Sequence, residues 1–488
     1  MSDRYYIKTF GCQMNENDSE RIAQLLAGQG MEEVANAAEA DVVVFNTCTI
    51  RENADNKFYG RVNQLRGLKQ SRPELRIVVA GCLAQGEREA IFRHAPHVDV
   101  VVGTHALSQL PDLLSRSDGR SQLLAVEEAE GVEDPLEDLG AKRDGGATAW
   151  VTIQTGCDNS CAFCIVPSVR GPERSRPFQA IVDEVAGLVA SGVSEVTLLG
   201  QNVNSYGRDL TRRLRASEGE GDWAHLVGSS YLGDAPIARI RPLFPELLRA
   251  VGAVPGVRRV RFTSPHPKDM REATFRAMAE TGAVCESLHF PLQSGSDRVL
   301  AAMHRGYNAE RFLERLALAR SIVADLAVTT DIIVGFPGET AADFDETLAV
   351  TAAAGFDSAY TFIYSPRPGT EAAAMVERYV DPATVQERFE RLKAVVERSA
   401  LQRHRERVGR VEEVLIEGVS KRDREVATGR TRQNKLVHLP GVDGAAAAGE
   451  YVEVEITGAR AHYLLGRFAG GSLSLLPGGS VTAEQGEK

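Results

Sequence analysis

The sequence predicts an α/β protein built from an N-terminal parallel α/β domain, a central partial (β/α) barrel and a small C-terminal β-barrel. The first two parts are predicted because β-rich runs alternate with helix-patterned stretches over residues 1–114 and again over residues 149–380. The third part is predicted because residues 408–471 hold short alternating strands separated by glycine, which is typical of a small all-β barrel.

The N-terminal domain is expected to be a parallel sheet flanked by helices. Its strand candidates are YYIKTF, DVVVFNTC, RIVVAGC and VDVVVG, and the helix-like SERIAQLLAGQG lies between the first two. Residues 115–148 then turn polar and acidic, without an apolar period that could bury one face. We therefore expect a linker over 115–148.

The central part repeats the alternation with the strand candidates AWVTIQT, SEVTLLG, RRVRFTS, SLHFPL, LAVTTDIIVGF and SAYTFIY. Such repetition suggests an open barrel whose active groups lie on loops after the strands. Residues 207–241 interrupt it with a charged, Gly-rich stretch that we expect to be a surface insertion. An amphipathic helix is expected over 381–407, and a disordered tail over 472–488.

Composition and charge narrow the function classes. The formal net charge of -11 argues against a protein that coats nucleic acid by bulk attraction, so any RNA contact must use local basic patches. The chain begins without an apolar signal-peptide core, and no stretch reaches the roughly 18 apolar residues of a membrane span. We expect a cytoplasmic protein that makes no membrane contact.

Three of the seven cysteines lie on one short loop after the strand candidate AWVTIQT, namely Cys157, Cys161 and Cys164. Three thiolates can hold three irons of a cubane cluster and leave the fourth iron open for a ligand. Structural zinc is the alternative, but zinc usually takes four protein ligands, and no fourth Cys or His lies nearby in the sequence. Without an export signal, disulfides are a weak explanation for these cysteines.

Another three cysteines, Cys12, Cys48 and Cys82, each follow a strand candidate of the N-terminal domain directly. A parallel sheet brings such positions to one edge, where α/β folds place their ligands. Taken singly, each is more often a buried structural cysteine, but the repeated placement predicts a second three-thiol site. Cys285 lies at the edge of an apolar strand in AVCESLHF and is expected to be a core residue.

The spacing Cys157-x3-Cys161-x2-Cys164 resembles the signature of radical S-adenosylmethionine (SAM) enzymes, and the two triads together resemble the methylthiotransferases. The match extends over TFGCQMNENDSE, FNTCTIRENA, AGCLAQ, FCIVPSVRGPERSRP, LLGQNVNSYG, RFTSPHPKD, HFPLQSGSDRVLAAMHRGY and DIIVGFPGET. GCQMNENDSE, GQNVNSYG and PLQSGS favour the MiaB-type members. The insertion at 207–241 departs from the family pattern and leaves the substrate detail open.

The resemblance implies two [4Fe-4S] clusters held by the six cysteines, with SAM as cofactor. In the family, one SAM methylates a sulfur on the first cluster, and a second SAM supplies the radical that abstracts hydrogen. MiaB-type enzymes methylthiolate C2 of N6-isopentenyl-adenosine beside the anticodon of tRNA. Other members act on threonylcarbamoyl-adenosine of tRNA or on an aspartate of a ribosomal protein. A non-catalytic RNA-binding iron or zinc protein is the alternative outside the family.

The resemblance also implies partners: the tRNA anticodon stem-loop, an electron donor such as flavodoxin or ferredoxin, and iron–sulfur carrier proteins acting on a monomer. Residues after the barrel strands or beside the cysteine loop are candidates to contact the cofactor, with strand-end capping or plain packing as the alternative. They are Phe163, Arg176, Gln201, Asn202, Gln293, Ser294 and Gly335.

Arg170 and Arg174 also stand beside the cysteine loop, where a cation could hold a carboxylate or a phosphate. His266 and His289 lie at strand ends and are expected to be structural. The last domain resembles the RNA-binding TRAM module, whose basic side chains could hold phosphates, although nearby carboxylates nearly balance them. The candidate RNA contacts are Lys421, Arg422, Arg424, Arg430, Arg432 and Lys435.

Overall fold

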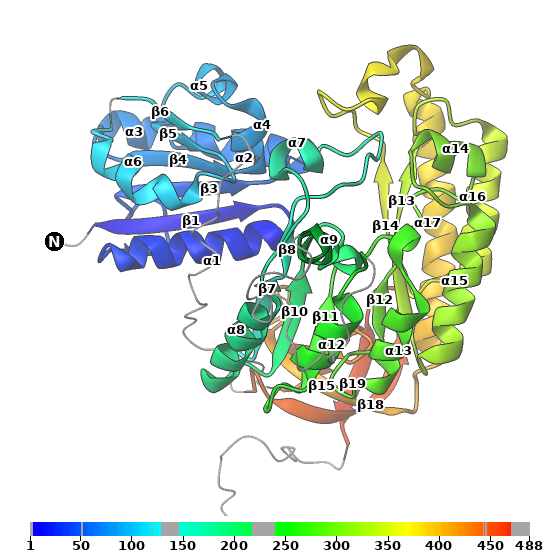
Figure 1. The fold of residues 1–488 in the computed structure, drawn as a ribbon. Coiled ribbons are helices and arrows are strands. Elements are labelled where there is room, and N and C mark those ends of the chain that lie inside the picture. Colours follow the sequence, from blue (N-terminus) through cyan, green and yellow to red (C-terminus); the bar gives the residue numbers. More distant parts are fainter. Residues whose placement is uncertain are drawn as a thin grey trace, which may run out of the picture.

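The computed structural model describes residues 3–49, 52–119, 121–127, 146–216, 240–442, 444 and 447–469, with the side chains of 52–56 left out. Three folded parts follow one another along the chain (Figure 1). Most of the expected linker (128–145), most of the expected insertion (217–239) and the expected tail (472–488) lie outside the described residues. Within them, no helix is long and apolar enough to cross a membrane.

The N-terminal domain is a six-stranded, wholly parallel sheet of order β2-β1-β3-β4-β5-β6. Its strands are β1 (Arg4–Phe10), β2 (Glu32–Glu33), β3 (Val42–Thr47), β4 (Arg76–Gly81), β5 (Val100–Val102) and β6 (Leu123–Ala125). The central strands are apolar on both faces because helices cover both. Helices α1 (Gln13–Gly28) and α6 (Leu110–Arg116) pack on one face. The other face packs against α2 (Glu52–Gln64), α3 (Arg66–Ser71), α4 (Cys82–Glu87) and α5 (Ala90–His94).

The N-terminal domain extends beyond residue 114, where the sequence pattern predicted its end, because it includes strand β6. Leu123, Leu124 and Ala125 pair with β5, so the sheet continues into the region predicted to be a linker over 115–148. The run is three residues long and only half-buried at the sheet edge. A strand of that length shows no readable apolar alternation, which is why the sequence pattern misses it.

The central domain is a half-barrel of six parallel strands, as predicted. The strands are β7 (Thr148–Thr152), β10 (Glu195–Leu199), β11 (Arg259–Phe262), β12 (Ser287–His289), β13 (Ala327–Val334) and β14 (Ser358–Ile363). They form two three-stranded sheets, and an isolated parallel bridge links Val260 of β11 to Val284, three residues before β12.

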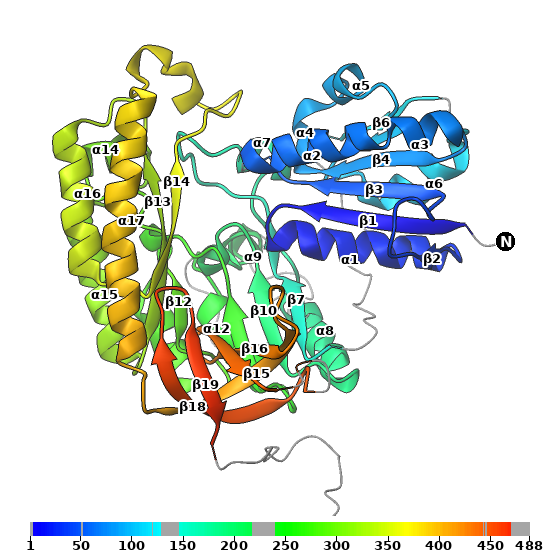
Figure 2. The same ribbon diagram turned by 180° about the vertical axis from the view of Figure 1, so that it is seen from behind.

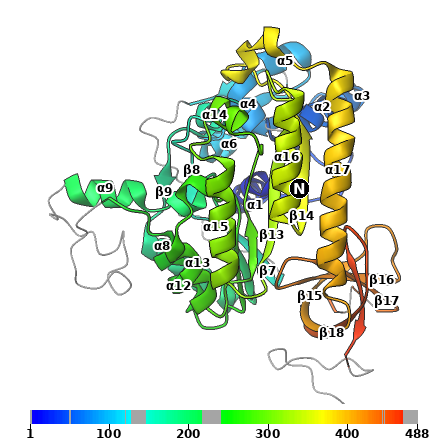
Figure 3. The ribbon, with the colours of Figure 1, turned by 90° about the vertical axis from the view of Figure 1, so that its right-hand side faces the viewer.

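Helices cover the outer side of the half-barrel and bury the largest core of the molecule against it (Figure 3). They are α8 (Phe178–Ala190), α12 (Phe244–Gly252), α13 (Glu272–Glu280), α15 (Ala309–Ile322), α16 (Ala341–Ala354) and α17 (Pro382–Arg405). A further helix, α9 (Arg208–Ala216), opens the predicted insertion, and its first turn is buried. The start of that stretch therefore belongs to the packed domain.

Helix α17 leads to the C-terminal barrel. Asp381 caps the helix by accepting a hydrogen bond from the backbone N–H of Thr384 at 3.0 Å, and proline occupies the first helical position. The barrel closes in the order β15-β16-β17-β19-β18. Its strands are β15 (Val411–Val419), β16 (Val426–Thr431), β17 (Leu436–Pro440), β18 (Tyr451–Ala459) and β19 (Leu464–Phe468).

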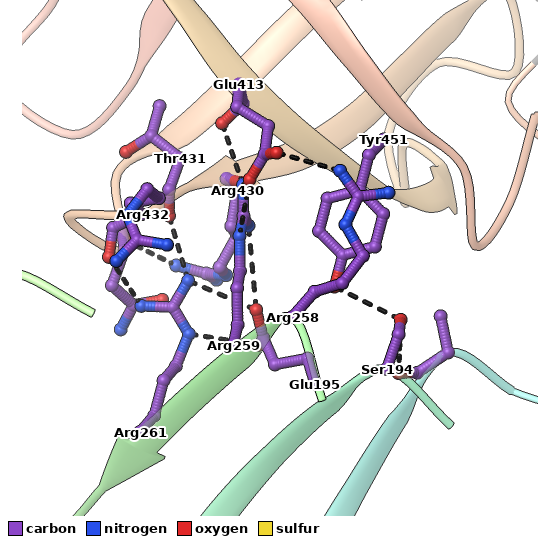
Figure 4. A network of polar contacts seen from close by, with 12 residues as sticks. Ser194, Glu195, Arg258, Arg259, Arg261, Glu413, Arg430, Thr431, Arg432 and Tyr451 are labelled. Atoms are coloured by element: carbon purple, nitrogen blue, oxygen red, sulfur yellow. Dashed lines mark hydrogen bonds and ion pairs between the residues drawn. The ribbon is translucent and has the colours of Figure 1, made fainter. Parts of the chain in front are cut away.

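The C-terminal barrel docks on the half-barrel through a buried polar network (Figures 2 and 4). The fully buried Arg259 donates to the carboxylate and the backbone carbonyl of Glu413, both at 2.8 Å, and to the carbonyl of Arg430 at 2.9 Å. Two residues further along β11, Arg261 donates to the carbonyls of Thr431 and Arg432. Since β11 begins at Arg259, the barrel sits at the N-terminal ends of the half-barrel strands.

Candidate active site

The first site lies at the C-terminal edge of the N-terminal sheet. Cys12, Cys48 and Cys82 follow β1, β3 and β4, which are neighbours in the sheet. The strand order reverses between β1 and β3, and parallel α/β sheets open a ligand-binding crevice at such a point. Cys48 and Cys82 are buried, Cys12 is half-buried, and none of the three forms a disulfide.

Two asparagines tie the loops of this site together. Asn15 donates to the Asn46 side chain and to the Thr47 carbonyl, both at 3.2 Å, and Asn46 donates back to the Asn15 carbonyl at 2.8 Å. Gly81, directly before Cys82, has a φ of 92°, and a Cβ there would lie 2.4 Å from Asn46 Oδ1. Only glycine allows that approach, so the residue before Cys82 is fixed by packing.

Electrostatics at the first site favour the thiolate, the metal-binding form of cysteine, at Cys12. A hydrogen bond from Cys48 lowers the pKa of Cys12 to about 6 against the opposing effect of burial, and the charge of Arg170 lowers it further. Burial raises the pKa of Cys82, while Arg170, 3.2 Å from its Sγ, opposes that rise.

The second site lies on the loop after β7. The chain continues through β8 (Gln154–Thr155), the three cysteines, α7 (Val166–Arg170) and β9 (Arg174–Ser175), and β8 and β9 pair antiparallel at the base of this loop. Cys157 donates its backbone N–H to the Gly171 carbonyl at 3.1 Å. Gly156 has a φ of 72°, and a Cβ there would lie 2.0 Å from the Pro172 carbonyl oxygen, so the loop requires glycine.

Polar side chains surround the thiols of the second site. Arg305 Nη1 lies 3.3 Å from Cys161 Sγ, and the Asn159 amide lies 3.5 Å from Cys157 Sγ. Lys268 donates to the same Asn159 at 2.6 Å. Burial raises the pKa of Cys164 to about 12 and that of Cys157 above its usual value. Cys157 and Cys164 are therefore costly to ionise unless a bound cation stabilises their thiolates.

The three cysteines of each site offer the ligand type that iron–sulfur clusters take, and buried polar atoms at the same end of the half-barrel as the second site suit a polar cofactor. Within the described ranges, no three His, Cys, Asp or Glu side chains are grouped closely enough to surround a single metal ion. Gln201 Oε1, Asn202 Oδ1 and Gln293 Oε1 are buried and lack a hydrogen-bond partner there. Because a buried orphan acceptor costs about 1–3 kcal/mol, donors from a bound molecule would stabilise this end of the half-barrel.

Family models match all three folded parts. The uncharacterised protein family UPF0004 matches residues 4–103, the radical SAM superfamily residues 151–350 and the TRAM domain residues 405–469. A Mycobacteroides abscessus protein named tRNA-2-methylthio-N(6)-dimethylallyladenosine synthase is 47% identical over 94% of this chain and 87% of its own. A Mycolicibacterium smegmatis protein of the same name is 46% identical over 94% of this chain and 86% of its own.

The chain belongs to the family of MiaB-type methylthiotransferases. It is a radical SAM enzyme, and it uses an iron–sulfur cluster and SAM. Among solved structures, the radical SAM methyltransferase TsrM from Kitasatospora setae aligns with a TM-score of 0.50 at 14% identity, covering 76% of this chain and 75% of that one. This likeness concerns the fold.

Other residues predicted to meet the cofactor have contacts within the protein. Arg176 donates to the Thr152 carbonyl at 2.7 Å and to Glu184 at 2.6 Å. Ser294 bonds Thr347, and the Gly335 N–H donates to Glu339. Phe163 packs beside a small core cluster that includes Phe336. Contact of these residues with the cofactor stays a prediction.

The two histidines differ in surroundings. Burial, together with the charges of Arg305 and Lys268, lowers the pKa of His266 to about 2, so this ring is neutral. Its Nδ1 accepts the backbone N–H of Lys268. His289 lies 3.2 Å from Asp331 and 3.0 Å from Thr329, both on β13, the strand beside β12.

The TRAM cations divide into two groups. Lys421, Arg422 and Arg424 are exposed in the turn between β15 and β16, and Arg430 pairs with Glu417 on the surface. Arg432 and Lys435 are engaged within the protein, and RNA contact by either stays a prediction. Arg432 binds Glu286 and two carbonyls of the half-barrel, and Lys435, 4% exposed, pairs with Asp357 at 2.6 Å. Both docking partners lie far away in the sequence, so composition alone cannot separate docking cations from exposed ones.

Arg305 and Tyr360 are further site residues that sequence reasoning missed. Arg305 lies 144 residues from Cys161 in the chain. The one feature of the sequence that could have pointed to it is its place in HRGY, the end of a segment that resembles the family. On β13, Val328, Ile332 and Val334 pack into the helix-covered core, so Thr329 and Asp331 face the inner side of the half-barrel. Tyr360 is the register partner of Asp331 and is 58% exposed on that inner face, with its ring 6.1 Å from that of His289.

Proposed function

We propose that this enzyme methylthiolates C2 of N6-dimethylallyladenosine beside the anticodon of tRNA, using two [4Fe-4S] clusters and SAM. The observation that carries the proposal is the pair of three-cysteine sites at the C-terminal edges of two adjoining parallel sheets. The names of the relatives support this nucleoside over threonylcarbamoyl-adenosine and over an aspartate of a ribosomal protein.

The chain's own residues divide the work between the two sites. Cys157, Cys161 and Cys164 hold the radical cluster, whose complex with SAM, when bound, supplies the one-electron chemistry needed to remove hydrogen from an aromatic C–H bond. Cys12, Cys48 and Cys82 hold the auxiliary cluster, which presents the sulfur. Both sites must reach one carbon atom of the substrate, which requires the two domains to be held in a fixed relation.

The inner face of the half-barrel offers a place for the base. Tyr360 presents an exposed aromatic ring there, and unstacked RNA bases are commonly bound by stacking on such rings. Hydrogen bonds between His289 and the side chains of Thr329 and Asp331 hold the imidazole that lies beside Tyr360 in place. Exposed Lys421, Arg422 and Arg424 of the TRAM domain are suited to phosphates of the anticodon stem-loop. Flavodoxin or ferredoxin is proposed as electron donor, with iron–sulfur carriers loading a cytoplasmic monomer.

The proposal is tested by metal content and by tRNA composition together. Anaerobically reconstituted enzyme should hold about eight irons, and either Cys12→Ala or Cys157→Ala should leave about four. In a bacterial strain that lacks its own enzyme of this family, the chain should restore methylthiolated dimethylallyl-adenosine in digested tRNA, and neither variant should. Cys285→Ala is the matched control because Cys285 is a buried core cysteine away from both triads. Unmodified tRNA with the intact chain would contradict the proposed substrate.

A further inference from the structure

A single arginine of the radical SAM domain reaches into the auxiliary site. Arg170 ends helix α7, six residues after Cys164, yet its guanidinium lies against the N-terminal domain. Its Nε donates to Cys82 Sγ at 3.2 Å, and its Nη2 donates to Asp18 at 2.6 Å. The side chains of Arg170 and Asp18 are each 6% exposed. Arg170, which the sequence placed beside the radical site, therefore contacts Cys82 of the auxiliary site.

The backbone around Arg170 is also fixed to the N-terminal domain. The Val169 carbonyl accepts a hydrogen bond from Thr104 Oγ1 at 2.7 Å, at the loop after β5. On the other side of the auxiliary site, Asn17 accepts from Thr152 Oγ1 at 2.9 Å and donates to the Trp150 carbonyl at 3.4 Å. The cysteine loop and strand β7 of one domain therefore hold the same edge of the other domain from two sides (Figure 1).

The charge at this position has a physical consequence for a cluster. Arginine keeps its positive charge in a protein interior, and a buried charge is tolerated only when it is paired. Asp18 supplies one negative partner, and the thiolate of Cys82 is the second group in hydrogen-bond reach. Hydrogen bonds to ligand sulfurs and nearby positive charge make reduction of an iron–sulfur cluster easier, because reduction adds negative charge.

We propose that Arg170 is a positioning residue through which the radical SAM domain fixes the cluster ligand Cys82 and raises the reduction potential of the auxiliary cluster. This inference rests on the auxiliary cluster of the proposed function. Its consequence is that the segment carrying the radical-cluster ligands also sets the electronic state of the cluster that presents sulfur. The two sites are then tuned by one stretch of chain, residues 157–170.

The experiment isolates the auxiliary cluster in the full-length chain. In a background with Cys157, Cys161 and Cys164 replaced by alanine, iron content and the midpoint potential are measured by redox titration with electron paramagnetic resonance. Arg170→Gln and Arg170→Lys are compared in that background. Arg388→Gln is the matched control, because Arg388 is equally buried and ion-paired, with Glu339 at 2.7 Å in the half-barrel.

Arg170→Gln should shift the midpoint potential to a more negative value. Arg170→Lys, which keeps the positive charge, should stay close to the background potential, and Arg388→Gln should leave it unchanged. Loss of the cluster from Arg170→Gln alone, with retention in Arg170→Lys, would also support the role of the charge. An unchanged potential in Arg170→Gln, equal shifts in both variants or loss of the cluster from both would overturn it. A background chain without any cluster would instead overturn the auxiliary site of the proposed function, and this inference with it.

Discussion

Replacement of Arg259 by methionine should loosen the TRAM domain from the half-barrel by about 3 kcal/mol. Arg259 is fully buried, and the change removes its ion pair with Glu413 together with its bonds to the carbonyls of Glu413 and Arg430. Removing one partner of a buried pair costs about 3–5 kcal/mol when the remaining charge is buried, and the Glu413 side chain is 28% exposed. The lower end applies, since Glu413 keeps a second partner in Arg258 at 2.9 Å.

Arg258→Met provides the matched control, because Arg258 pairs with the same carboxylate but its side chain is 33% exposed. An exposed ion pair contributes less than about 1 kcal/mol, and the stacking of Arg258 on Tyr451 adds about 0.5–1 kcal/mol. Hydrogen exchange of β15 and β16 reports opening of the docked barrel. The amides should exchange about 100-fold faster in Arg259→Met but less than about 30-fold faster in Arg258→Met. Equal acceleration in both variants would refute the role assigned to burial.

Three further predictions concern pH, RNA binding and the substrate base. Burial and the charge of Lys435 lower the pKa of His404 to about 4, below the roughly 6.5 of an unfolded histidine. The unfolded chain therefore takes up the proton first, and the free energy of unfolding should fall as the pH drops from about 6.5 to 4. In denaturation measured over this pH range, His404→Gln should reduce the dependence on pH. The same change at the exposed His462 should leave that dependence unchanged. Replacing the exposed TRAM cations Lys421, Arg422 and Arg424 by glutamine should reduce the slope of log K against log salt concentration for anticodon stem-loop binding by about 2. An unchanged slope would mean that the RNA binds elsewhere. Tyr360→Ala should raise the KM for stem-loop RNA, and Tyr360→Phe should not; equal kinetics in both would exclude stacking there.

The positions of the two three-cysteine sites are predictable from sequence because the strands before them are visible as apolar runs. Val42–Thr47 is buried throughout, so its pattern is clear, and Cys48 must follow it at the sheet edge. The short strand β6 is not recognised from the sequence, because three half-buried residues are too few to show an alternation of apolar and polar side chains. Local pattern thus locates ligands that directly follow long strands and misses elements that depend on their neighbours.

Contacts between distant segments are what the sequence leaves undetermined. Arg170, Arg305 and Lys435 each carry a charge whose partner lies far along the chain, at Cys82, Cys161 and Asp357 respectively. Proximity in sequence suggested cofactor contact for Arg170 and RNA contact for Lys435. In the structure Arg170 contacts Asp18 and Cys82, and Lys435 pairs with Asp357, because a buried cation must be paired with an opposite charge. Contact of either residue with cofactor or RNA stays a prediction.

The most direct test of two clusters with separate tasks is a comparison of products from purified, reduced enzyme. Intact chain, SAM and a stem-loop RNA carrying dimethylallyl-adenosine should give both 5′-deoxyadenosine and the methylthiolated nucleoside. Cys157→Ala should give neither, whereas Cys12→Ala should still cleave SAM to 5′-deoxyadenosine but yield no methylthiolated product. Methylthiolated product from Cys12→Ala would contradict the account, because sulfur would then not come from the site formed by Cys12, Cys48 and Cys82.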